Sequence, residues 1–124
     1  MPTIMIVEDD SAVSHMLCDV LIDYGYSVVM AFDGYNALQQ LQGVEPDLIL
    51  CDEMMPRMAG HDLCLRLAAH EKYRHIPVVM MSARHLESIP APETCLMFIR
   101  KPFSHDDLLN TLVDILGDPP TYLN

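Results

Sequence analysis

The chain has 124 residues, 51% of them hydrophobic, which suits one domain with a buried core and excludes a disordered chain. Its formal net charge of −11 argues against direct nucleic-acid binding by this segment, because phosphate contacts need Lys and Arg. The N-terminus carries no signal pattern, and no apolar run is long enough to span a membrane. We therefore expect a cytoplasmic protein that makes no contact with the membrane.

The four cysteines have no CxxC spacing and three lie within apolar patterns, so we interpret them as reduced packing residues. Five short apolar runs predict buried strands, and apolar residues at helical spacing follow most of them. The predicted strands are Thr3–Val7, Ser27–Ala31, Leu48–Cys51, Pro77–Met81 and Leu96–Ile99. Strands that alternate with helices predict a doubly wound α/β domain, with a parallel sheet and helices on both faces.

The helices have recognisable ends. Asp10 or Ser11 can cap the first helix, and Gly25 ends it. Ser104 and Asp107 have the spacing of a capping box at the start of the last helix, which Gly117 ends.

Polar residues stand at the carboxyl ends of four predicted strands. They are Glu8 with Asp9, Asp52, Ser82 and Lys101. In a doubly wound sheet these strand ends lie at one edge, so the side chains are expected to share a small cleft. Carboxylates that close together favour a hard divalent cation such as Mg²⁺. With the cation present, one carboxylate could attack a phosphoryl group and form an acyl phosphate.

With these features the chain resembles the receiver domain of two-component response regulators. The matching segments are IVEDD at 6–10, CDEMMPRMAG at 51–60, MSA at 81–83 and KPF at 101–103. The resemblance covers nearly the whole chain and implies a CheY-like fold: five parallel strands in the order 2-1-3-4-5 with five flanking helices. We expect residues 1–117 to form the receiver domain and residues 118–124 to be a C-terminal tail or the start of a linker.

The resemblance also implies roles for the strand-end residues. Asp52 would be the phosphoacceptor, and Glu8, Asp9, Asp52 and the backbone carbonyl of Met54 would bind Mg²⁺ or Mn²⁺. Ser82 and Lys101 would bind phosphoryl oxygens. Each residue alone also has an ordinary interpretation: an acid can cap a helix, and a lysine is usually a solvated charge.

Further roles are implied for residues around this set. Phe98 would be an aromatic switch that moves with Ser82, although an aromatic residue at such a position is as often part of the core. Ala83 would leave access for the phosphodonor, and Met54 and Arg84 would tune dephosphorylation. The resemblance also implies a cis Lys101–Pro102 peptide bond.

One segment departs from the family pattern. Residues 83–95 read ARHLESIPAPETC, where similar domains carry a longer helix. A helix cannot run through Pro90 and Pro92, so the fourth helix should be short or irregular. The charged residues that pair across the active dimer of many DNA-binding regulators are not evident, so we do not expect that mode of dimerisation.

The function implied is Mg²⁺-dependent transfer of a phosphoryl group to Asp52 from a histidine kinase or a histidine phosphotransfer protein. The modified domain would then switch a partner or an output domain C-terminal to residue 124, without being a turnover enzyme. An alternative is a phosphorylation-independent, receiver-like interaction module. A phosphatase with an aspartyl-phosphate intermediate is disfavoured, because Met54 stands where such sites carry a second acid.

Overall fold

The computed structural model describes residues 2–83 and 95–117. The strands are β1 (Thr3–Val7), β2 (Ser27–Ala31), β3 (Leu48–Asp52), β4 (Val78–Ser82) and β5 (Cys95–Arg100). The helices are α1 (Ser11–Asp23), α2 (Gly34–Gln40), α3 (Gly60–Ala69) and α4 (His105–Leu116). Two predictions fall outside the described residues: the short or irregular fourth helix predicted for 83–95, of which 84–94 are not described, and the tail at 118–124.

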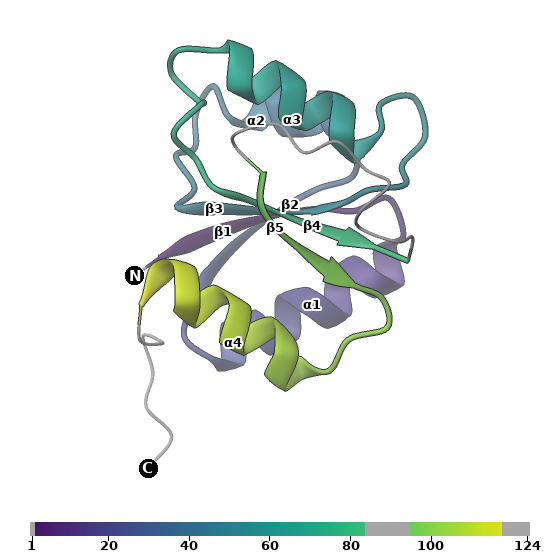
Figure 1. Ribbon diagram of the computed structural model, residues 1–124, viewed down its shortest axis with the longest axis vertical. Helices are drawn as coiled ribbons and strands as arrows, with labels where there is room; N and C mark the ends of the chain where they lie inside the picture. The colour runs from purple at the N-terminus through teal and green to yellow at the C-terminus, as the bar shows by residue number, and fades with distance from the viewer. Residues whose placement is uncertain (1, 84–94, 118–124) are drawn as a thin grey trace.

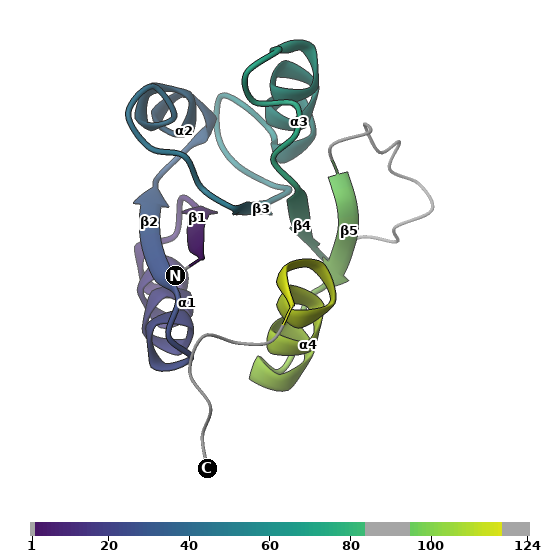
Figure 2. The ribbon, with the colours of Figure 1, turned by 90° about the vertical axis from the view of Figure 1, so that its left-hand side faces the viewer.

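The sheet has five parallel strands in the order β2-β1-β3-β4-β5, which confirms the predicted doubly wound fold. Helices α1 and α4 cover one face, and α2 and α3 cover the other (Figures 1 and 2). Four helices lie among the described residues, and the fifth expected one was predicted mainly on residues outside them. The last predicted helix, between Ser104 and Gly117, is therefore α4.

The core has two layers because the central strands are buried on both faces. Ile49 and Cys51 of β3 pack toward α2 and α3, and Leu48 and Leu50 pack toward α1 and α4. All residues of β3 and β4 are buried, which explains why these strands are continuous apolar runs in the sequence. This alternation also decides to which face of the sheet a polar side chain at the strand end belongs.

Local hydrogen bonds fix the ends of two helices as the sequence predicted. The Asp10 side chain caps α1 by accepting from the backbone N–H of Ala12 at 2.9 Å. Ser104 and Asp107 form a reciprocal capping box at the start of α4, and Gly117 follows its last turn with φ at +89°. These caps satisfy backbone N–H groups that have no partner within the helix.

Two expectations from composition can be compared with the described part of the chain. None of its helices has the length and apolar character needed to cross a membrane. Cys51 and Cys64 are buried in the core and Cys18 is partly buried, as the packing interpretation requires.

Candidate functional site

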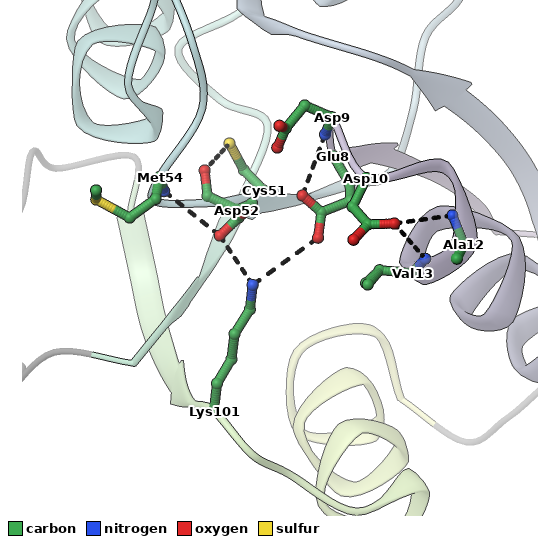
Figure 3. Close-up of polar contacts among 9 residues, drawn as sticks. All are labelled: Glu8, Asp9, Asp10, Ala12, Val13, Cys51, Asp52, Met54 and Lys101. Atoms are coloured by element: carbon green, nitrogen blue, oxygen red, sulfur yellow. Dashed lines mark hydrogen bonds and ion pairs between the residues drawn. The ribbon is translucent and has the colours of Figure 1, made fainter.

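Asp52 ends the central strand β3 and is the buried centre of a polar cluster. Its side chain lies at the carboxyl edge of the sheet, and the residue is only 6% exposed. The Nζ atom of Lys101, just after β5, lies 3.0 Å from Asp52 Oδ1 and 3.8 Å from Glu8 Oε1 (Figure 3). The ammonium group thus bridges two carboxylates that come from different strands.

Glu8 and Asp9 reach the same edge because β1 pairs directly with β3. Val7 lies opposite Cys51 in the register, which sets Glu8 beside Asp52. One carboxylate oxygen from each of Glu8, Asp9 and Asp52 lies within 4.8 Å of the others. Glu8 is buried and Asp9 is exposed, so the cluster is open to solvent on one side. Three carboxylates in this arrangement fit a hard cation that keeps several waters.

The environment of Glu8 shifts its protonation equilibrium. Burial, followed by the hydrogen bond and charge of Asp52, raises the pKa of the Glu8 carboxyl from 4.5 to about 8, while Lys101 acts in the opposite direction. In the absence of a cation, the cluster therefore retains a proton near neutral pH. A divalent cation bound by the carboxylates would oppose this shift, because its positive charge favours the ionised form of Glu8.

Ser82 ends β4, and its hydroxyl has a carboxylate partner that the sequence analysis did not single out. Ser82 Oγ donates a hydrogen bond of 2.8 Å to Oε1 of Glu53, and both residues are almost completely buried. The backbone N–H of Glu53 donates to the carbonyl of Met81, so Glu53 extends the pairing of β3 with β4 beyond Asp52. A signal was available, because Glu53 follows Ile49 and Cys51 in the strand alternation and so points toward the buried layer.

The loop from β3 to α3 is held tightly against the site. A Cβ atom on Gly60 would lie 2.5 Å from the backbone oxygen of Asp52, so only glycine fits there without a shift. Arg57 adopts a positive φ of 68° and forms an ion pair with buried Asp33, the N-cap of α2. The sequence analysis missed this pair, because its members are 24 residues apart and neither carries a motif.

Comparison with known protein families gives an assignment for the chain. The family model described as the response regulator receiver domain matches residues 4–113, nearly the whole chain. The chain belongs to the response regulator receiver domain family. Receiver domains of two-component systems are phosphoacceptors, and they interact with histidine kinases and often carry output domains.

Two relatives support the same assignment, and a further solved structure shares the fold. The phosphate regulon transcriptional regulatory protein PhoB of Escherichia coli is 38% identical over 109 residues, which cover 86% of this chain and 48% of PhoB. A crystal structure of a response regulator from Chloroflexus aurantiacus superposes with a TM-score of 0.86 at 34% identity, covering 94% of this chain and 99% of the other. The receiver domain of sensor histidine kinase PA1611 from Pseudomonas aeruginosa has a TM-score of 0.82 at 23% identity, covering 94% and 98%.

The chain covers only part of the length of its curated relatives. This receiver domain spans about half the length of PhoB and 8% of a hybrid signal transduction histidine kinase of Dictyostelium discoideum, to which it is 30% identical over 93% of its own length. The PA1611 structure is described with a magnesium ion coordinated in the active-site cleft. That ion belongs to the PA1611 structure. Because PA1611 is only 23% identical to this chain, the comparison shows a shared fold and nothing more.

The remaining predicted residues of the receiver domain lie around the cluster. Phe98 is partly buried against the layer between the sheet and helices α2 and α3, and Ala83 is exposed. Met54 is 66% exposed, and its backbone N–H lies 3.4 Å from Asp52 Oδ1. The Lys101–Pro102 peptide bond is cis, as expected. Arg84 lies outside the described residues, and the individual roles of all these residues stay predictions.

Proposed function

We propose that this receiver domain accepts a phosphoryl group on Asp52 in a reaction that depends on a divalent cation. The observation that carries the proposal is the convergence of one ammonium and three carboxylates at a single strand edge, with Lys101 Nζ 3.0 Å from Asp52 Oδ1. Four strand ends supply these groups and Ser82, although the residues are far apart in the sequence. Such a cluster is unusual, because lysines and acids on protein surfaces are usually exposed to solvent.

The acidic cluster is suited to hold the cation. Glu8, Asp9 and Asp52 would bind Mg²⁺ or Mn²⁺ together with the backbone carbonyl of Met54. When bound, the cation supplies positive charge that stabilises the oxygens of a transferring phosphoryl group. The mixed burial of the carboxylates favours this use, because the exposed Asp9 leaves the site open to solvent and to a donor.

Asp52 would act as the nucleophile. A carboxylate oxygen of Asp52 forms the new P–O bond while the P–N bond of a donor phosphohistidine breaks, and the electron pair leaves with the imidazole nitrogen. Lys101 would pair with one phosphoryl oxygen and Ser82 would donate a hydrogen bond to another. The product is an aspartyl phosphate on a domain that turns over no other substrate. The donor would be a histidine kinase or a histidine phosphotransfer protein.

The signal would pass through the strand that carries Phe98. Ser82 and Phe98 are the proposed switch residues, Ala83 the position that admits the donor, and Met54 and Arg84 the positions that tune dephosphorylation. We also propose that residues 1–117 form the receiver unit and 118–124 a tail or linker to an output domain. The strongly acidic chain is suited to act in the cytoplasm through protein partners, without touching nucleic acid or membrane itself.

Asp52→Asn tests this proposal. The purified protein is incubated with radiolabelled acetyl phosphate and Mg²⁺, and the acid-stable and acid-labile label is counted. Wild type should acquire acid-labile label, and Asp52→Asn should acquire less than about a hundredth of it, because the amide is no nucleophile. Asp114→Asn, the same change at an exposed position of α4, is the matched control and should label like wild type.

Two outcomes would contradict the proposal. Undiminished labelling of Asp52→Asn would move the acceptor to another residue. Absence of label in wild type, with no response to beryllofluoride and Mg²⁺, would instead favour the phosphorylation-independent interaction module.

A further inference from the structure

The residue that follows the phosphoacceptor is an acid, and its position is unusual for an acid. Glu53 is 2% exposed, although it carries a carboxylate and lies at the end of a strand. Buried acids are rare unless a hydrogen bond or a charge compensates their desolvation. One such partner is Ser82, whose Oγ lies 2.8 Å from Glu53 Oε1. The carboxylate therefore has a defined contact with the hydroxyl that the proposed function assigns to a phosphoryl oxygen.

Strand alternation places the contact between Ser82 and Glu53 on the face of the sheet opposite to that of the Asp52 carboxylate. Along β3, the side chain of Glu53 is on the same face of the sheet as Ile49 and Cys51. Along β4, the side chain of Ser82 is on the same face as Val78 and Met80. These four apolar residues pack in the layer toward α2 and α3. Asp52 continues the alternate face of β3, where Leu50 packs toward α1 and α4. The Ser82 hydroxyl is therefore held toward Glu53, on the face of the sheet opposite to that of the Asp52 side chain.

The chemistry of the hydroxyl makes the two contacts exclusive. A serine has one O–H proton, so it can donate one hydrogen bond at a time. A phosphoryl oxygen on Asp52 and the carboxylate of Glu53 are both acceptors, and they compete for that single proton. A carboxyl oxygen and a phosphoryl oxygen are both good acceptors of a hydroxyl proton, so the resting contact is a substantial competitor.

We propose that Glu53 is a positioning residue that holds Ser82 in its resting orientation and so opposes the switched state of the domain. This inference rests on the proposed function, because it assigns a cost to the Ser82 movement that phosphorylation requires. A contact present only in the resting state shifts the equilibrium toward that state by its own free energy. Phosphorylation must then outweigh the Ser82–Glu53 hydrogen bond before Ser82 turns toward Asp52.

The test is a double-mutant cycle read by beryllofluoride binding. Beryllofluoride with Mg²⁺ stands in for the phosphoryl group on Asp52, and its Kd is measured by NMR titration of the backbone amides. Glu53→Met removes the acceptor at similar volume, and Glu53→Gln keeps an acceptor without the charge. We expect Glu53→Met to lower the Kd about tenfold, which corresponds to about 1.4 kcal/mol, and Glu53→Gln to lower it less.

The decisive comparison is the same substitution without the hydroxyl. In the Ser82→Ala background Glu53→Met should leave the Kd unchanged, because the competing proton is gone. An equal tightening in both backgrounds would show that Glu53 acts through its charge alone and would overturn the proposal. No tightening with Ser82 present would overturn it too. Glu71→Met, at an exposed position, is the control for a general loss of negative charge.

A second readout separates this inference from the proposed function. The Ser82 side-chain rotamer is measured from its coupling constants in the metal-free, unmodified protein. A fixed rotamer in wild type that becomes averaged in Glu53→Met supports the positioning role even if beryllofluoride does not bind, an outcome that would contradict the proposed function. An identical rotamer in wild type, Glu53→Gln and Glu53→Met would overturn the positioning role, whatever the result of the binding titration.

Discussion

Glu8 is buried beside Asp52, with the ammonium of Lys101 between the two carboxylates, and its charge state depends on this burial and on both neighbours. Its pKa of about 8 means that the folded, metal-free protein binds a proton that the unfolded chain, with a pKa near 4.5, releases. The free energy of unfolding therefore falls as pH rises from about 4.5 to 8 through this residue. Below that window both states are protonated, and above it neither is.

Glu8→Gln should remove this dependence. In EDTA, the variant should gain about 1–3 kcal/mol in the free energy of unfolding, relative to wild type, between pH 5 and pH 8.5, because it no longer buries a charge at high pH. Urea denaturation at the two pH values measures the difference. Exposed Glu71→Gln is the control and should follow wild type. A Glu8→Gln effect that is the same at both pH values would show that Glu8 carries no shifted proton.

Side chains at strand ends are the site residues that the sequence predicts best. Asp52, Glu8, Asp9 and Lys101 could be expected to meet, because the edge of a parallel sheet collects the carboxyl ends of its strands. The partner of Ser82 could not be predicted, since it depends on the register of β3 against β4 and on the rotamer of Glu53. A sequence contains neither quantity directly.

At the scale of elements, the loop between β3 and α3 is tied to the start of α2. The Asp33 side chain accepts from the backbone N–H of Asn36 at 2.7 Å and also pairs with Arg57. Asp33 is buried and Arg57 is 66% exposed, so most of the contribution should come from the cap rather than the ion pair. The pair nevertheless fixes the loop that follows Asp52.

Substitution of Asp33 should separate these contributions. Asp33→Ala should cost about 1–2 kcal/mol in the free energy of unfolding, because it removes the acceptor for the Asn36 N–H. Asp33→Asn keeps an acceptor and loses only the charge, so its cost should be clearly smaller. Urea denaturation at pH 7 gives both values. Equal costs for the two variants would mean that the ion pair with Arg57, not the cap, stabilises this region.

Most elements could be predicted because their signals are local. The five strands were identified from apolar runs, and the capping box of α4 was readable from Ser104 and Asp107. Boundaries were less exact: β5 begins at Cys95 and ends at Arg100, one residue beyond the predicted run at each end. The reason is physical, because hydrogen-bonded pairing continues into polar residues that the hydrophobic pattern does not mark.

At the scale of the whole molecule, the sheet order brings distant segments to one edge. Strand β3 lies between β1 and β4, so the end of β3 has Glu8 on one side and the end of β4, with Ser82, on the other, and Lys101 reaches Asp52 from the end of β5. The order 2-1-3-4-5 came from the family resemblance, because alternating strands and helices predict a parallel sheet but not its permutation. The site depends on that permutation.

The most direct test of the central claim is to locate the phosphoryl group chemically. Protein treated with acetyl phosphate and Mg²⁺ is reduced with borohydride, which converts an aspartyl phosphate to homoserine, and its peptides are sequenced by tandem mass spectrometry. We predict homoserine at position 52, dependent on Mg²⁺ and abolished by EDTA. Homoserine at another aspartate, or equal conversion of Asp52 without a divalent cation, would contradict the account.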